Sequence, residues 1–221
     1  MKKLILILLT LSLTSVFLFS GCKKEDPLLP YVSELRENIY EGNADGFFLK
    51  ANYGFSEYPL ISDGGVGAKR YALTFLLSGD INTEIEYRLS FSFGGNDYFG
   101  TFAFDPVKES RVLSFYIENF YPKTFVVSFG YSDKTAEVEL KSIVPDGIAN
   151  YKEILSSLYE KQTAFIDSLK ENGKFTAEIS LRVLVRDGKA YYYVGVTKQN
   201  YLKAFLMDAK TKELLAIREI R

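Results

Sequence analysis

The sequence predicts a β-sandwich-like antiparallel domain followed by a small α+β unit, and three observations support this. Short runs of alternating apolar and polar residues fill residues 47–142, as expected for strands with one buried face. One amphipathic helical stretch begins near residue 150. Four more alternating runs follow it, which is the arrangement of an α+β unit. The two units are expected at residues 31–148 and 149–221.

The N-terminus has the pattern of a secretory signal peptide. Met1-Lys2-Lys3 supplies a cationic start, and the chain is then apolar from Leu4 to Phe19, interrupted only by threonine and serine. This run is too short for a good membrane-spanning helix, which needs about 20 apolar residues. Residues 1–21 are therefore predicted to be a signal peptide.

The single cysteine, Cys22, stands directly after this segment. The stretch Phe19-Ser20-Gly21-Cys22 resembles the lipobox of bacterial lipoproteins, with Phe19 where that family usually has leucine. The resemblance implies that Cys22 carries a lipid and becomes the first residue of the mature protein. An uncleaved anchor and an ordinary signal with a stray cysteine are the alternatives. Residues 22–30 contain two prolines and are expected to form a short tether.

Lipidation implies a location and a first partner. Two or more acyl chains would anchor the protein stably to the membrane. Lys23 and Lys24 would then lie at the headgroups, where each basic residue contributes about 1 kcal/mol of attraction to an anionic leaflet. The predicted localisation is extracytoplasmic, with the protein anchored to the cell membrane by the lipid at Cys22.

Composition excludes several classes of chemistry. The 221 residues contain no histidine and one cysteine, which rules out Ser-His-Asp and Cys-His nucleophiles and zinc sites built on those ligands. Asp63–Lys69 is rich in glycine but lacks the Gly-Lys-Ser/Thr ending of a phosphate loop. No catalytic residue, metal or cofactor is predicted. Without residues 1–21 the net charge is −3, and no dense basic stripe suggests nucleic acid as a partner.

The first unit is expected to begin with a helix and continue as seven strands. Residues 31–42 place Val32, Leu35 and Ile39 near helical spacing, with Gly42 as a stop. Turn residues at 94–97 connect two arms of a predicted hairpin. The expected strands are residues 47–53, 70–77, 84–93, 98–104, 112–117, 125–131 and 136–140.

The second unit is expected to be one helix followed by a meander. Asn150 and Glu153 have the spacing of a capping box. Asp187-Gly188 is the strongest short-range signal for a hairpin turn. The helix is expected to end at Gly173, and its apolar stripe contains Ile154, Leu155, Leu158, Phe165, Ile166 and Leu169. The expected strands are residues 179–185, 190–196, 201–207 and 214–220.

The end of the chain resembles a bacterial envelope module. A helix, a strand meander and the stretch Asp208-Ala209-Lys210-Thr211-Lys212-Glu213-Leu214 are similar to the PepSY family, which commonly has an Asp-Ala-Lys-Thr-Gly-Glu turn between its last two strands. Lys212 stands where that turn has glycine. The resemblance covers residues 149–221 and implies protein binding or restraint of a protease. No family resemblance is recognised in the first unit.

Two sets of residues are candidates for binding. Tyr191 and Tyr193 lie on the strand face opposite Tyr192, so one set is expected to remain outside the helix-packed core. The alternative is that the outer tyrosines pack against the first unit. Tyr31, Tyr40, Tyr116 and Tyr121 are further tyrosines that either line a cleft or fill one.

A basic face is the second candidate surface, with anionic wall polymer or lipid as its ligand. Lys210 and Lys212 lead this set, and a solvated face that balances an acidic first unit is the alternative. The further members are Lys198, Lys203 and Arg218.

Paired carboxylates raise the question of glycan hydrolysis. Glu84 with Glu86, and Glu137 with Glu139, share strand faces at a separation that such chemistry permits. Basic and hydroxyl side chains share those faces, as on any solvated sheet. The sequence therefore predicts a membrane-anchored, non-catalytic envelope lipoprotein that binds an envelope protein or wall polymer. A carboxylate-based envelope glycan hydrolase and a protease-restraining PepSY-type regulator are the alternatives.

Overall fold

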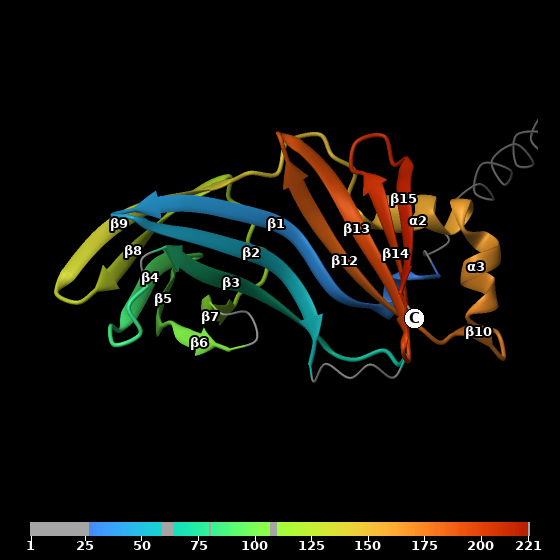
Figure 1. Cartoon of the computed structure of the whole chain (residues 1–221), viewed down its shortest axis with the longest axis horizontal. Coiled ribbons are helices and arrows are strands. Elements are labelled where there is room, and N and C mark those ends of the chain that lie inside the picture. Colours follow the sequence, from blue (N-terminus) through green and yellow to red (C-terminus); the bar gives the residue numbers. More distant parts are fainter. Residues whose placement is uncertain (1–26, 59–63, 80, 107–109, 221) are drawn as a thin grey trace, which may run out of the picture.

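The computed structural model describes residues 27–58, 64–79, 81–106 and 110–220. A strongly curled and mostly antiparallel sheet is followed by helices and a small hairpin unit, which confirms the predicted fold class (Figure 1). The predicted signal peptide, the lipidation site Cys22 and most of the tether lie outside the described residues. Among the residues that are described, no helix is long and apolar enough to cross a membrane.

The first half of the chain forms strands of the large sheet. Two-residue turns at Asp45-Gly46 and Gly94-Gly95 connect two of its hairpins, and all four of these residues have positive φ. The strands are β1 (Val32–Ala44), β2 (Phe47–Glu57), β3 (Lys69–Gly79), β4 (Tyr87–Phe93), β5 (Asn96–Thr101), β6 (Ala103–Asp105), β7 (Ser110–Tyr116), β8 (Thr124–Tyr131) and β9 (Lys134–Ser142).

The helix predicted for residues 31–42 is wrong, because these residues form most of strand β1. Only a short 3-10 turn, η2 (Leu29–Tyr31), precedes the strand. Strand β1 pairs with three other strands, and their backbone hydrogen bonds outweigh the weak helical spacing. The predicted tether also ends earlier than expected, since Leu28 is only 1% exposed and belongs to a core.

The second half contains the helices and the C-terminal meander. Its elements are α2 (Tyr151–Lys161), α3 (Thr163–Ser168), β10 (Lys170–Glu171), β11 (Lys174–Phe175), β12 (Glu178–Arg186), β13 (Lys189–Lys198), β14 (Tyr201–Asp208) and β15 (Leu214–Ile220). The capping box is present: Oδ1 of Asn150 accepts a 3.1 Å hydrogen bond from the amide of Glu153, whose carboxylate accepts one of 3.0 Å in return.

The single helix predicted to end at Gly173 is wrong in extent. The helix breaks at Gln162, where φ is −127°, and its second part ends at Ser168. Asn172 and Gly173 both have positive φ and form the two-residue turn of the β10–β11 hairpin. The predicted apolar stripe still faces the core, since all six of its members are buried or packed against it.

Strand β1 joins the two halves into one sheet. The order along the sheet is β15-β14-β13-β12-β1-β2-β3-β7-β6, and β4, β5, β8 and β9 lie off this path. The β1–β12 pairing is parallel, whereas the other pairings within the sheet are antiparallel. The two predicted units are therefore not separate sheets, because β1 belongs to both.

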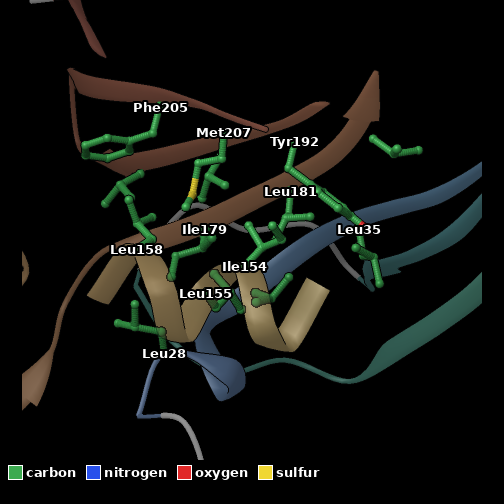
Figure 2. Packing of buried hydrophobic residues seen from close by; sticks show 14 of the residues in the cluster. Leu28, Leu35, Ile154, Leu155, Leu158, Ile179, Leu181, Tyr192, Phe205 and Met207 are labelled. Carbon is green, nitrogen blue, oxygen red and sulfur yellow. The ribbon is translucent and has the colours of Figure 1, made fainter. Parts of the chain in front are cut away.

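Two apolar cores lie along this sheet. One core fills the space among β1 to β4, β8 and β9 and is rich in tyrosine and phenylalanine. The other packs helix α2 against the C-terminal strands: Figure 2 shows Ile154, Leu155 and Leu158 of the helix facing Ile179 and Leu181 of β12. Leu28 lies beside the helix in the same cluster. Both β1 and β2 contribute to both cores, which fixes the halves to each other.

Candidate functional site

The site lies where strand β1 changes its neighbour. Residues 32–36 of β1 pair with β12, whereas Tyr40 and Glu41 pair with β9. Figure 1 shows β9 and β12 lying along opposite ends of β1. Residues 37–39 therefore lie at a fork in the sheet. A strand whose neighbours diverge in this way leaves a crevice, and binding sites are usually concave.

A β-bulge places Glu37 at this fork. Arg36 lies opposite Gly54 and Asn38 lies opposite Tyr53, so Glu37 is an extra residue on β1. Bulges commonly re-aim a side chain next to a functional site. A Cβ atom at Gly54 would lie only 1.8 Å from the carbonyl oxygen of Leu35, so the close approach of the two strands at the bulge requires glycine.

A cavity of about 600 Å³ occupies the fork. We call it the fork cavity. Its walls come from β1, from the loop between β7 and β8, from the segment that connects β9 to α2, and from β13. The residues that line it are Glu37, Asn38, Tyr121, Pro122, Lys123, Ser142, Ile143, Val144, Pro145, Asp146, Gly147, Ile148, Ala149, Asn150, Tyr151 and Tyr192.

Glu37 has no cation beside it, in contrast to the other acids of its strand. Oε1 of Glu37 accepts a 3.1 Å hydrogen bond from the hydroxyl of Tyr121, and within the described residues no lysine or arginine lies within ion-pair distance. Glu34 instead pairs with Arg36 at 2.9 Å and with Arg182 at 2.6 Å. Glu37 is thus a half-buried carboxylate whose charge is not balanced by the protein.

The pKa values of Glu37 and Glu34 shift in opposite directions, because Glu34 has arginine partners and Glu37 does not. Burial raises the pKa of Glu37 above its ordinary value, and the Tyr121 hydrogen bond opposes this only in part. Burial acts in the same direction on Glu34, but the hydrogen bond from Arg182 and the nearby guanidinium of Arg36 leave its pKa below the ordinary value. Two glutamates three residues apart therefore have opposite shifts.

Tyrosines surround Glu37. Tyr121, Tyr151 and Tyr192 line the fork cavity. Tyr53 lies behind Tyr121, with ring centroids 5.4 Å apart, and stacks on Tyr71 at 5.9 Å. Burial raises the pKa values of these tyrosines, that of Tyr71 to about 12, and the negative charge of Glu37 adds to the increase in each of them. Their hydroxyls thus remain protonated beside the carboxylate.

Several other polar groups of the walls already have partners. Asn38 accepts a 2.7 Å hydrogen bond from Ser142. The hydroxyl of Tyr192 donates to the carbonyl oxygen of Ala149 at 3.2 Å, and Lys123 pairs with Asp146 at 2.7 Å on the exposed rim. The amides at the start of helix α2 are taken by Asn150. Among the charged groups of the walls, Glu37 is therefore the one that a ligand could engage without displacing an ion pair.

No family model, curated protein or solved structure matches the chain. Within the described residues, no three acidic or cysteine side chains are close enough together to hold a metal ion. A single unbalanced carboxylate among aromatic rings is suited to binding a cationic or hydrogen-bond-donating group.

The four residues predicted to bind a partner all lie on the C-terminal meander. Tyr191 and Tyr193 are half-buried on the face of β13 opposite Tyr192, as the alternation predicted. Lys210 is exposed in the turn between β14 and β15, and the carbonyl of Lys212 accepts a hydrogen bond from Ser157 of helix α2. None of the four lines the fork cavity.

The other tyrosine and lysine candidates lie on several different elements. Tyr121 lines the fork cavity, whereas Tyr40 is fully buried in a core and Tyr31 packs on Phe175. Tyr116, the last residue of β7, is 64% exposed and lies outside the fork cavity. Two members of the basic set are engaged by acids: Lys198 pairs with Glu171 at 2.6 Å and Lys203 with Glu219 at 2.8 Å.

Sequence reasoning missed Glu37 because it expected a helix there. A usable signal exists in the spacing of buried residues on β1. Leu35 and Tyr40 both point into a core but lie five positions apart, an odd offset that would place them on opposite faces of a regular strand. A change of phase within an alternating run indicates a bulge between the two residues.

Proposed function

We propose that the chain is an envelope lipoprotein, anchored by a lipid at Cys22, whose folded body is a non-catalytic module that binds an envelope protein or wall polymer. The observation that carries the proposal is the fork cavity, with the unbalanced carboxylate of Glu37 among tyrosines. Tyrosine supplies a large contact area with a polar tip, and its enrichment is typical of binding surfaces.

The short tether supports a role at the membrane surface. Leu28, which is already buried in the core, lies only six positions after Cys22. Even fully extended, such a segment reaches about 20 Å. The body would thus remain close to the membrane, where anchoring raises its effective concentration for partners in the same layer.

A binding role fits the carboxylates better than glycan hydrolysis does. Hydrolysis needs two acids across one groove, with one of them kept protonated. Glu86 lies 3.5 Å from Arg88 and Glu139 lies 2.7 Å from Lys141, and all four side chains are exposed and outside the fork cavity. Asp146 is the second acid that lines the cavity, but it is exposed and paired with Lys123.

A PepSY-type regulator is the second candidate, and one observation favours it. Lys212 has φ of +62°, the left-handed conformation that glycine adopts readily. It stands where the PepSY turn has glycine, so the turn keeps a backbone shape suited to that family despite the different residue. A protein partner, such as a protease, would then be the target.

Retention on an immobilised chain tests the proposed function. The full chain, held on a surface in a non-ionic detergent, is exposed separately to purified wall sacculi and to solubilised envelope proteins of its own organism. We expect one of these to be retained, and we expect Tyr121→Ala to weaken retention at least tenfold. Tyr121 is 55% exposed, so its removal is expected to preserve the fold.

Two further variants locate the surface. Tyr116→Ala removes an exposed tyrosine outside the fork cavity and should leave retention unchanged. Loss of retention in the double variant Tyr191→Ala and Tyr193→Ala, but not in Tyr121→Ala, would move the binding surface to the outer face of β13. If neither wall polymer nor any envelope protein is retained by the unmodified chain, the binding function is wrong.

A further inference from the structure

We infer that the fork cavity binds an organic ammonium group, with Glu37 as its counter-ion and the lining tyrosines as aromatic walls. The inference rests on the proposed function and names the chemical class that the module recognises. An ammonium group can belong to a primary amine, such as a lysine side chain, or to a quaternary amine, and both share a positive charge on an apolar stem.

The charge of Glu37 sets it apart from the other glutamates of strand β1. Three glutamates project from strand β1 near the fork, and two of them have cations: Glu34 with Arg36 and Arg182, and Glu41 with Lys50 at 3.2 Å. Glu37 faces the cavity with one hydrogen bond, from Tyr121, and with no cation from the described residues. A half-buried charge without a partner is costly, so a cationic ligand would gain the interaction that the protein leaves open.

The walls of the fork cavity contain three tyrosines. Tyr121, Tyr151 and Tyr192 come from three different elements and line the same space as Glu37. Aromatic rings attract ammonium groups through the electron density of their faces, by about 0.5–2 kcal/mol for each contact. The apolar side chains of Ile143, Val144 and Ile148 complete the walls on the connecting segment. Such a lining suits a cation that carries hydrocarbon.

Anions and divalent metal ions fit the fork cavity less well than an ammonium group does. An anion would meet the carboxylate of Glu37, and two amides at the start of helix α2, those of Lys152 and Glu153, already donate to Asn150. A divalent metal ion needs several oxygen ligands, and the cavity offers one carboxylate that is not already paired. The volume of about 600 Å³ exceeds that of a bare ammonium ion, so the group would be part of a larger molecule.

Isothermal titration calorimetry of the full chain in dodecyl maltoside tests the inference. The probes are n-butylammonium for a primary amine and choline for a quaternary one, each compared with a neutral analogue, 1-butanol and 3,3-dimethyl-1-butanol. We expect at least one cation to bind with a stoichiometry of one, and its neutral analogue to bind at least tenfold more weakly. The probe that binds more tightly identifies the type of amine.

Variants separate the role of Glu37 from general effects on the fold. Glu37→Gln retains the shape and the hydrogen bond acceptor but removes the charge, and it should weaken binding of the cation at least tenfold. Glu41→Gln removes an acid of the same strand that lies outside the cavity, and it should leave binding unchanged. Circular dichroism of both variants checks that the strand content is preserved.

Three results would overturn the inference: no binding of either cation, equal binding of a cation and its neutral analogue, or unchanged binding in Glu37→Gln. Its failure is distinguishable from failure of the proposed function. If the cations do not bind but Tyr121→Ala still abolishes retention of wall polymer or of an envelope protein, the ligand class is wrong and the binding function stands.

Discussion

The hydroxyl of Tyr121 donates a 3.1 Å hydrogen bond to Oε1 of Glu37, across 84 positions of sequence. This contact joins the bulge of the central strand β1 to the loop between β7 and β8, and it forms part of the wall of the fork cavity. It is the one hydrogen bond to the carboxylate of Glu37 within the described part of the chain, so the carboxylate is oriented by it but its charge is not neutralised.

Replacing Glu37 by glutamine should stabilise the unliganded protein at neutral and alkaline pH. Burial raises the pKa of Glu37 above its ordinary value of 4.5, so the folded state holds this proton more tightly than the unfolded chain does. Stability is therefore lost as the pH rises from the unfolded-state pKa through the folded-state pKa, and the full loss persists at higher pH. Thermal unfolding should show a higher Tm for Glu37→Gln at about pH 8, with a difference that vanishes below about pH 4.5.

Glu34→Gln is the matched control with the opposite sign. The pKa of Glu34 is lowered, so its ionised form stabilises the fold above its unfolded-state pKa, and this contribution is lost as the pH falls. Its Tm should therefore be below that of the unmodified chain at about pH 8. A change of Tm in the same direction in Glu34→Gln and Glu37→Gln would contradict the opposite pKa shifts of the two glutamates.

The ionisable groups that interact electrostatically with Glu37 are tyrosines, and one ion pair, Lys123–Asp146, lies on the rim of the cavity. These tyrosines are Tyr40, Tyr53, Tyr71, Tyr121, Tyr151 and Tyr192.

Gly54→Ala should disrupt the bulge that positions Glu37. The added Cβ atom would lie 1.8 Å from the carbonyl oxygen of Leu35, a backbone atom that cannot move without breaking the β1–β2 pairing. We expect a loss of more than about 3 kcal/mol in the free energy of unfolding, measured by urea denaturation. Gly130→Ala is the control, because its nearest contact would be 3.8 Å and its effect should stay within about 1 kcal/mol.

Leu28→Ala should destabilise the core of the C-terminal half. Leu28 is 1% exposed and packs with helix α2, although it lies in a segment that the sequence suggested was a tether. Removal of a buried leucine side chain costs about 2–5 kcal/mol in unfolding free energy, to be measured by chemical denaturation. Leu215→Ala, at an exposed position of β15, should change it by less than about 0.5 kcal/mol. If Leu28→Ala changed the free energy of unfolding as little as Leu215→Ala does, the folded body would begin after Leu28.

Lys212→Gly should stabilise the turn between β14 and β15. A residue with a Cβ atom at φ of +62° carries a conformational cost that glycine avoids, and the net gain should be about 0.5–1 kcal/mol. Differential scanning calorimetry should record a higher Tm. Lys210→Gly in the same turn is the control: Lys210 does not have positive φ, so glycine there should be neutral or destabilising. A lower Tm for Lys212→Gly would contradict the strained turn.

Local signals in the sequence predicted most of the strands and turns. The Asp187-Gly188 turn has positive φ at both residues and connects β12 to β13, as that dipeptide predicted. The capping box of Asn150 and Glu153 is also confirmed. These features depend on residues that are close in the chain, where alternation, capping and turn chemistry operate directly.

The sequence by itself determined the antiparallel character of the protein, the buried face of each regular strand and the exclusion of histidine- and cysteine-dependent chemistry. Only the tertiary structure decided that residues 32–44 form a strand, that β1 pairs with β12 in parallel, and that Glu37 faces a cavity. The physical reason is that these features depend on pairing between strands up to 148 positions apart, as in the contact of Glu34 with Arg182. Periodicity within one segment carries no information about which distant strand completes it.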